Sequence, residues 1–216
     1  MGVVVLVSGA VGGVGASTLA YALAQCAGGV LVDMQADGVP LDVLVGAETL
    51  PGTRWSQVRV STGEIAPDAI LSALPVINGV TLLSADFVST GDAAALVHVI
   101  EVLRKTSVLV VVDLPLRHGV RDVLHADAEI LLTPPTVPAL IVAAATSANE
   151  LRLVIADRGP ADIDHRAISR YLNHDVIGAV RWQRGVAMAM SSGSPIPDST
   201  DVMRIARLIC DEVNNA

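Results

Sequence analysis

Short apolar runs alternate with longer amphipathic segments along the whole chain. Runs rich in Val, Leu and Ile, bounded by glycine, proline or polar residues, predict strands. The predicted strands lie at 3–8, 29–33, 80–84, 107–113, 129–133, 152–156 and 176–180. Apolar residues recurring at three- and four-residue spacing between these runs predict helices. The predicted helices lie at 17–27, 66–74, 91–104, 138–150, 162–172 and 200–213.

Strands that alternate with helices of this length are typical of repeated βαβ units. We therefore expect an α/β fold, a mostly parallel twisted sheet of about seven strands with helices on both faces. Right-handed crossovers place the loops that follow the strands at one edge, where ligands usually bind. Residues 191–197 are predicted to form a loop before a closing helix, so a single domain over residues 1–216 is expected.

Composition supports a buried core and limits the classes of function. The chain is 52% hydrophobic and 17% charged, which suits a parallel sheet covered on both faces. Its net charge of -8 argues against a general nucleic-acid surface, because phosphate binding needs concentrated Lys and Arg. No basic segment precedes the first strand and no apolar run reaches the roughly 18 residues of a membrane span, so a cytoplasmic location is expected.

The last predicted helix, 200–213, is amphipathic and raises the question of membrane binding. Helices that lie on membranes usually carry Lys and Arg along the polar face to meet anionic lipid. Here the polar face sets acidic residues against Arg204 and Arg207. We therefore expect this helix to pack on the sheet.

A glycine-rich segment, VSGAVGGVGAST at 7–18, joins the first predicted strand to the first predicted helix. Glycines let a backbone adopt positive φ and turn its amides toward an anion. The start of the following helix adds a partial positive charge. The segment therefore predicts a phosphate-binding loop.

The same loop also matches a dinucleotide-binding pattern. Read as G-x-x-x-G-x-G from Gly9, with an acidic residue at Asp33, it resembles a short-chain dehydrogenase. That class of enzyme needs a Tyr-x-x-x-Lys pair for proton transfer. Lys105 is the only lysine in the chain and no tyrosine precedes it at that spacing, so this alternative is disfavoured.

Residues 11–18, VGGVGAST, resemble the deviant Walker A motif K-G-G-x-G-K-[ST]-[ST] of the ParA/MinD ATPases. Every position matches except the two lysines, which are Val11 and Ala16 here. Three further segments resemble that family in the right order: VLVD at 30–33, a Walker B-like strand at 108–113, and LLTP at 131–134. The chain is thus identified as similar to the ParA/MinD superfamily over most of its length.

Within that superfamily the chain is most similar to the CpaE/TadZ branch and its actinobacterial, septum-site-determining-like members. The similarity lies in the lysine-poor loop, in LVDMQADGVPLDVLVG at 31–46 and in PGTRW at 51–55. It implies a spatial organiser in Tad-type pilus assembly or septum placement, recruited to a cell pole or septum by protein partners. It also implies a possible homodimer and at most indirect membrane contact. The receiver-like N-terminal domain of many CpaE proteins is not expected, because the sequence begins at the P-loop.

The resemblance implies ATP and Mg²⁺ as ligands. Ser17 stands where the family ligates Mg²⁺, and Asp33 and Asp113 stand where its acidic residues hold the ion through water. The residues expected to bind the cofactor are Gly12, Gly13, Val14, Gly15, Ala16, Ser17, Thr18, Asp33 and Asp113, with Ser17, Asp33 and Asp113 at the metal.

The substitutions predict weak or absent ATP binding and negligible hydrolysis, so no catalytic residue is expected. Ala16 cannot neutralise charge on the β- and γ-phosphates, and a hydrogen bond to a charged group is worth roughly 1.5–3 kcal/mol. Gln35 replaces the second aspartate of the family's D-x-D element and can orient water but cannot accept a proton. Val11 removes the lysine that reaches across to a partner's nucleotide in this family.

Three arginines could restore the missing positive charge, because the guanidinium fork suits phosphate oxygens. They are Arg54, Arg117 and Arg121. A slow ATPase rescued by one of them or by a partner protein therefore stays open. A scaffold that binds no nucleotide stays open as well.

Overall fold

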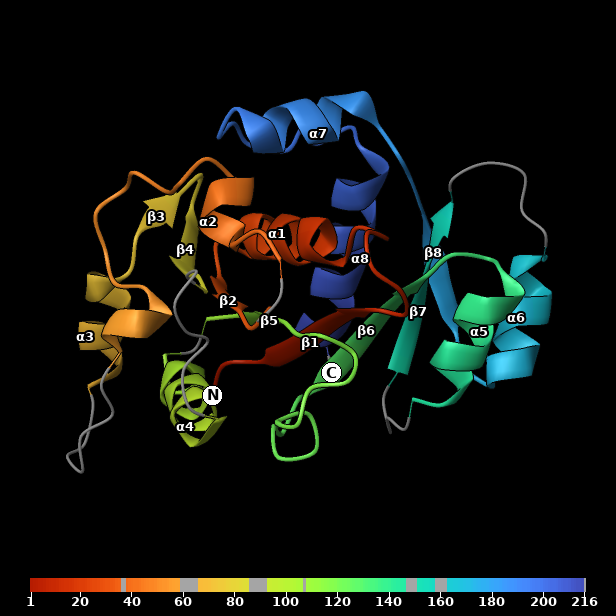
Figure 1. Ribbon diagram of the computed structural model, residues 1–216, viewed down its shortest axis with the longest axis horizontal. Coiled ribbons are helices and arrows are strands. Elements are labelled where there is room, and N and C mark those ends of the chain that lie inside the picture. Colours follow the sequence, from red (N-terminus) through yellow and green to blue (C-terminus); the bar gives the residue numbers. More distant parts are fainter. Residues whose placement is uncertain are drawn as a thin grey trace.

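The computed structural model describes residues 1–35, 38–58, 66–85, 93–106, 108–146, 151–157 and 163–215. Its strands form one sheet of eight strands in the order β3-β4-β2-β5-β1-β6-β7-β8 (Figure 1). The pairing within this described sheet is parallel except between β3 and β4. The strands are β1 (Val4–Gly9), β2 (Val30–Asp33), β3 (Val76–Ile77), β4 (Val80–Leu83), β5 (Val110–Asp113), β6 (Ala128–Thr133), β7 (Leu151–Asp157) and β8 (Val176–Arg181).

Helices follow most of the parallel strands, which is the expected α/β arrangement. The helices are α1 (Ala16–Ala27), α2 (Leu41–Leu44), the short 3-10 helix η1 (Trp55–Gln57), α3 (Pro67–Ala73), α4 (Ala93–Arg104), α5 (Val137–Ala144), α6 (His165–Leu172), α7 (Arg184–Ser191) and α8 (Asp201–Asn214). No helix in the part of the chain that the structure describes is long and apolar enough to cross a bilayer.

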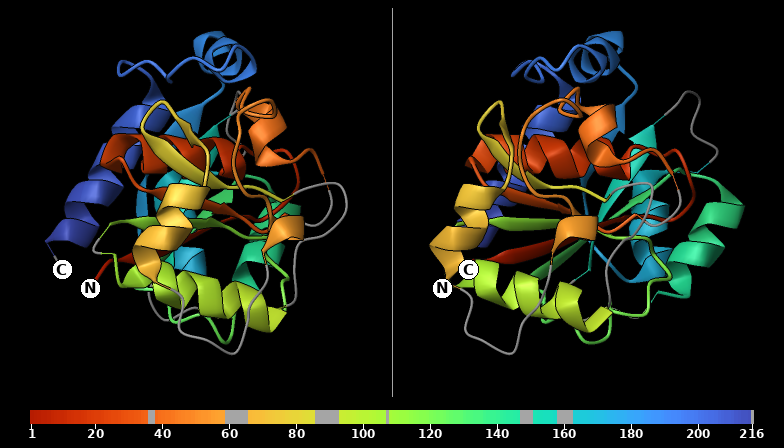
Figure 2. Two further views of the ribbon diagram at one scale, coloured as in Figure 1. Left: turned by 90° about the vertical axis from the view of Figure 1, so that its left-hand side faces the viewer. Right: turned by 60° about the vertical axis from the view of Figure 1, so that its left-hand side comes forward.

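Both faces of the sheet are buried, as predicted. Successive side chains of a strand point to opposite faces, and in β1 Val5 and Val7 pack with α1 and α8 while Val4 and Leu6 pack with α4. Figure 2 shows α1 and α8 on one side of the sheet and α4 on the other. Helices α5 and α6 cover the remaining half of the α4 face, over β6 and β7.

The predicted strands and helices are present, with boundaries shifted by a few residues. Helix α5 ends at Ala144, before the predicted end at 150. Positions 91–92, 107, 147–150 and 162 of the predicted elements lie outside the described residues. The sheet has eight strands rather than about seven, because β3 adds a two-residue antiparallel edge.

The sheet brings two strand-end carboxylates together. Strand β2 pairs with β5 so that Asp33 lies opposite Asp113, the last residue of each strand. Strand β1, on the other side of β5, leads directly into the glycine-rich loop. Loops that follow parallel strands meet at one edge, so the fold gathers the predicted site residues there.

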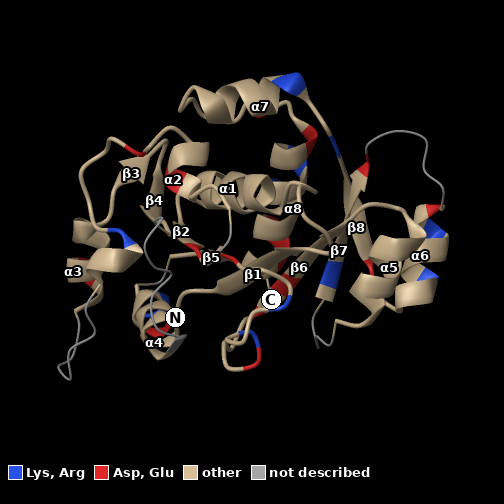
Figure 3. Cartoon of the chain, in the orientation of Figure 1, with Lys and Arg blue, Asp and Glu red and all other residues tan. Residues whose placement is uncertain are grey.

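Charged residues are dispersed over the described part of the molecule. Figure 3 shows Lys and Arg spread over several helices, strands and loops, with acidic residues between them. Several of the arginines are paired with acidic side chains, as in Arg152 with Glu212 and Arg181 with Asp201. The exclusion of nucleic acid as a partner stays a prediction.

Candidate functional site

The glycine-rich loop folds back on the end of β1. A Cβ at Gly9 would lie 2.7 Å from Cγ2 of Val14 and 3.0 Å from the carbonyl oxygen of Val11, so only glycine fits there. Gly13 and Gly15 have φ of 72° and 100°, in the left-handed region that glycine tolerates. The loop therefore has its shape because of these three glycines.

The loop leaves the start of α1 open to an anion. Gly15 is the N-cap of α1, no side chain caps the helix, and its first turn contains no acidic residue. A Cβ at Gly12, Gly13 or Gly15 would meet no atom of the described residues within 4 Å. Protein packing does not demand glycine at these positions, so the free space beside the loop is available to a ligand. Uncapped amides and the helix dipole favour a phosphate in that space.

Two cavities flank the loop. The larger, about 610 Å³, is lined by the whole of 9–18, including the seven loop residues predicted to bind the cofactor. Its other described walls are Gln35, Leu44, Pro115, Leu116, Arg117 and Val142. We call it the P-loop cleft. The second cavity, about 260 Å³, shares Gly13, Val14, Gly15 and Thr18 with the cleft, and its lining includes Trp182 and Gln183.

Gln35 connects the cleft to the two buried carboxylates. Its backbone N–H donates to Asp33 Oδ1 at 3.0 Å, and its side-chain Nε2 donates to Asp113 Oδ1 at 3.2 Å. Both carboxylates are fully buried. Neither belongs to the described lining of the cleft, so both lie behind Gln35 and Ser17 rather than at its surface.

Asp113 has the features of a cation ligand. Burial raises the pKa of its carboxyl group to about 6, the Ser17 hydroxyl that donates to it opposes this shift, and the neighbouring Asp33 charge adds to it. Its Oδ2 is buried and has no hydrogen-bond partner among the residues that the structure describes. Hydroxyl and carboxylate oxygens are the ligands that Mg²⁺ takes in phosphate sites. Ser17 and Asp113 therefore fit a divalent cation beside the loop.

Asp33 is engaged differently. Its carboxylate accepts hydrogen bonds from the backbone N–H of Gln35, Leu41 and Ala85 and, at 3.4 Å, from the Ser84 hydroxyl. Burial raises the pKa of this carboxyl group, and these hydrogen bonds oppose the rise. The side chain thus anchors the segments that follow β2 and β4. Its predicted contact with a metal stays a prediction.

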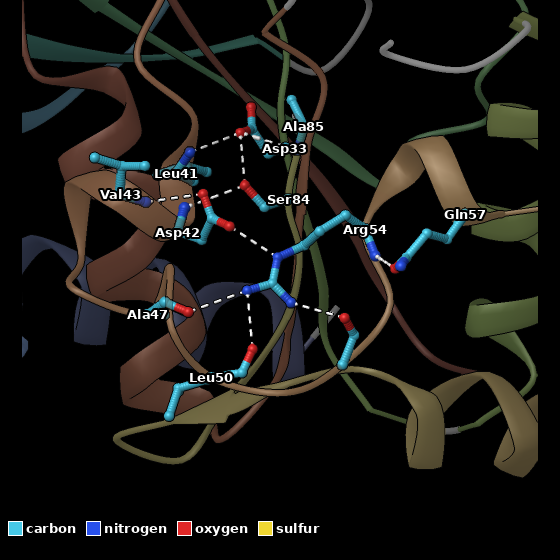
Figure 4. Close-up of polar contacts among 11 residues, drawn as sticks. Asp33, Leu41, Asp42, Val43, Ala47, Leu50, Arg54, Gln57, Ser84 and Ala85 are labelled. Carbon is cyan, nitrogen blue, oxygen red and sulfur yellow. Dashed lines mark hydrogen bonds and ion pairs between the residues drawn. The ribbon is translucent and has the colours of Figure 1, made fainter. Parts of the chain in front are cut away.

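A second set of polar contacts extends this anchor (Figure 4). The Asp42 N–H donates to Ser84 Oγ at 3.1 Å, and Arg54 Nε donates to Asp42 Oδ2 at 2.8 Å. The remaining nitrogens of Arg54 donate to the carbonyl groups of Ala47, Leu50 and Gly52. The guanidinium of Arg54 is therefore occupied within its own loop and is not free to reach a phosphate.

Of the other two candidate arginines, only one faces the cleft. Arg121 pairs with Glu129 and donates to Ser8 Oγ at 3.1 Å, so its guanidinium is also occupied. Arg117 lines the P-loop cleft and forms no ion pair or side-chain hydrogen bond with any residue in the described part of the chain. The three candidates of the sequence are thus reduced to one.

Solved structures with this arrangement of elements are ParA and MinD proteins. A chain of the MinC:MinD cell division protein complex of Aquifex aeolicus matches with a TM-score of 0.75 and 20% identity, over 98% of this chain and 96% of that chain. The chain has the fold of the ParA/MinD P-loop ATPases. A ParA family ATPase from Chlorobium tepidum matches with a TM-score of 0.72 and 14% identity, over 97% and 99% of the two chains.

Other matches add to this picture without adding a function. The septum site-determining protein MinD from Pyrococcus horikoshii, complexed with Mg-ADP, matches with a TM-score of 0.70 and 19% identity over 99% of this chain and 96% of that chain. No family model matches the chain. The uncharacterized proteins MT3760 and Rv3660c of two Mycobacterium tuberculosis strains are 34% identical over 203 residues, or 89% of this chain. The match spans 58% of the length of these curated relatives.

Proposed function

We propose that this chain is an organising protein that binds ATP and Mg²⁺ in the P-loop cleft, hydrolyses almost none of it, and acts by binding other proteins. The observation that carries the proposal is a glycine-rich loop with free space beside it for a phosphate, in which Val11 and Ala16 stand where ParA/MinD ATPases have lysines. Residues 1–216 are taken as one domain of this kind. The relatives are longer, so the activity of a whole protein of that type is part of the proposal.

The chemistry of each wall supports a position for each part of the ligand. The phosphates lie against the backbone of 12–18, at the uncapped start of α1. Ser17 and Asp113 would hold the cation, with Asp33 behind them, and a bound cation would neutralise phosphate charge. The base would lie in the second cavity beside Trp182, which is 70% exposed and could stack on it.

Hydrolysis is disfavoured by what the site lacks. Removing one preorganised electrostatic donor commonly lowers a rate by about 10²–10³, and Ala16 removes one. The Gln35 amide cannot accept a proton from water. Its Nε2 already donates a hydrogen bond to Asp113 Oδ1. The chain can therefore hold a nucleotide more readily than cleave it.

The rim of the cleft suits a protein partner. Val11 is 39% exposed where the family has a lysine, and α5, whose Val142 lines the cleft, exposes 59% of Val137 and 58% of Ile141. Exposed apolar side chains beside a ligand site allow nucleotide to alter partner binding. MinD occurs in a complex with MinC in the solved structure from Aquifex aeolicus. We infer that the partner of this chain is a pilus or septum component that recruits it from the cytoplasm. The alternative partner is a second copy of this chain, in a homodimer.

Phosphate release from Mg-ATP tests this function directly. The wild-type protein and Asp113→Ala should give the same background rate, because no catalytic path exists to be lost. Ala16→Lys should bind ATP more tightly without becoming a fast ATPase, since Gln35 remains. Steady turnover in the wild type that disappears in Asp113→Ala would establish the slow ATPase instead. No change in melting temperature with Mg-ATP would favour a scaffold without nucleotide.

A further inference from the structure

We propose that Arg117 supplies the positive charge on the phosphate side of the P-loop cleft that Ala16 cannot supply. The inference rests on the proposed function and names both the residue that sets affinity and the class of ligand, a polyphosphate anion. Arg117 would contact phosphate oxygens from the wall opposite the start of α1, with no bond made or broken.

The position of Arg117 is set by the sheet. Strand β5 ends at Asp113, and the chain continues through Pro115 and Leu116 along the cleft wall to Arg117. The same cleft is lined by Ala16, the first residue of α1. Arg117, in the loop after β5, therefore lines the same cavity as Ala16, the position of the missing lysine.

Arg117 is the only charged side chain among the described residues that line the cleft. Much of the rest of that lining is glycine or apolar, including Leu44, Leu116 and Val142. No acidic side chain is among the described residues that line the cleft, so none competes there with an anion for this cation. Among the described residues of the cleft, no ion pair or side-chain hydrogen bond engages this guanidinium.

Most other arginines in the described part are already committed to acidic groups. Those in ion pairs are Arg54, Arg104, Arg121, Arg152, Arg181, Arg204 and Arg207. Arg117 is exposed and also borders a smaller cavity whose one acidic side chain, Asp122, forms no ion pair with it. In a chain of net charge -8, an unpaired guanidinium beside an anion-binding loop indicates a ligand contact rather than a structural one.

Calorimetric titration with two probes, Mg-ATP and inorganic tripolyphosphate, tests the inference on the full chain. Arg117→Ala should weaken binding of both probes by roughly 10- to 150-fold, the range for a lost charge-assisted hydrogen bond. Arg117→Lys should keep part of the affinity. Arg166→Ala is the matched control, because Arg166 is also exposed and lies on α6 outside both cavities. It should bind both probes within twofold of the wild type.

Two further readings separate a ligand contact from a structural effect. The melting temperature without ligand should be the same for wild type and Arg117→Ala, since no described contact is lost. Adding Ala16→Lys to Arg117→Ala should restore affinity by returning a cation to the cleft. Equal affinity of wild type and Arg117→Ala would overturn the inference alone. Loss of ATP binding with tripolyphosphate binding unchanged would also overturn it. A wild type that binds neither probe would overturn the proposed function and this inference together.

Discussion

At the scale of single residues, the buried carboxyl group of Asp113 makes stability depend on pH. Burial raises its pKa from 3.8 to about 6, so the folded protein binds this proton more tightly than the unfolded chain does. The contribution of this group to stability is therefore fully present below about pH 4 and is lost as the pH rises through 6. At 1.36 kcal/mol for each pKa unit, the loss at neutral pH is about 3 kcal/mol.

Asp113→Asn should accordingly stabilise the protein at pH 7.5 by about 1–3 kcal/mol in magnesium-free buffer, because a buried anion is removed. The gain should shrink toward zero near pH 4, where the wild-type carboxyl group is already neutral. Urea unfolding at both pH values measures it. Asp122→Asn, at an exposed aspartate, is the control and should change little at either pH. A gain of the same size at both pH values would contradict this explanation.

Arg54→Ala should lower the free energy of unfolding by roughly 3 kcal/mol, because it leaves a mostly buried carboxylate unpaired. The side chains of Arg54 and Asp42 are only 13% and 11% exposed, and three carbonyl groups lose their donor as well. Urea unfolding measures the change, with Arg166→Ala as the exposed control. A loss below about 1 kcal/mol would show that these contacts do not hold the segment.

The residues of the site differ in how far the sequence could predict them. The loop glycines and Ser17 were predictable, because positive φ and the start of a helix follow from neighbouring residues. The hydrogen-bond partners of Asp33 were not, since Ser84 and Ala85 lie 51 and 52 residues away and meet it only through the pairing of β2 with β4. The PGTRW segment carries a family resemblance in sequence, but the ion pair of Arg54 with Asp42 depends on how the loop folds.

At the scale of elements, α8 is bound to the sheet through its apolar face, as its mixed polar face predicted. Its buried residues are Val202, Met203, Ile205, Ala206, Ile209 and Cys210, and they pack with α1 and β8. The fit is close at β8, where a Cβ on Gly178 would lie 2.3 Å from Cδ1 of Ile205. The face that a membrane would need is therefore already used in the core.

Two positions on α8 make this packing testable. Ile205→Ala should destabilise the protein by about 2–4 kcal/mol, because a fully buried side chain is replaced by a cavity. Leu208→Ala on the same helix should change stability by less than about 1 kcal/mol, because Leu208 is 46% exposed. Thermal or urea unfolding of the Ile205→Ala and Leu208→Ala variants measures both changes in stability. Equal effects would mean that α8 is not seated on the sheet as described.

Elements missed from the sequence are the short ones. Strand β3 has two residues and pairs through a turn at Asn78 and Gly79, whose φ values are 51° and 80°. An Asn-Gly pair between apolar residues is a recognised hairpin signal, so this one could have been found. Helix α7 could not be recognised as easily, since it has eight residues with Gly185 in its first turn. Periodicity over so short a segment is too weak to predict a helix.

At the scale of the whole molecule, the two tryptophans report on different regions. Trp55 is buried and its indole N–H donates to the carbonyl group of Asp33 at 2.8 Å. Trp182 is exposed and lines the second cavity. Mg-ATP should therefore change the intrinsic fluorescence through Trp182, and Trp182→Phe should abolish that change while leaving the fold intact. A change that persists in Trp182→Phe would mean that the base does not lie in this cavity.

The central claim is that a P-loop without its lysines still binds a nucleotide. Calorimetric titration of the wild-type protein with ATP, with and without Mg²⁺, tests it most directly, and Ala16→Lys is the reference. The account predicts saturable, magnesium-dependent binding that is weaker than in Ala16→Lys, with no phosphate released during the titration. Absence of binding at several millimolar ATP, or affinity that Ala16→Lys does not improve, would contradict it.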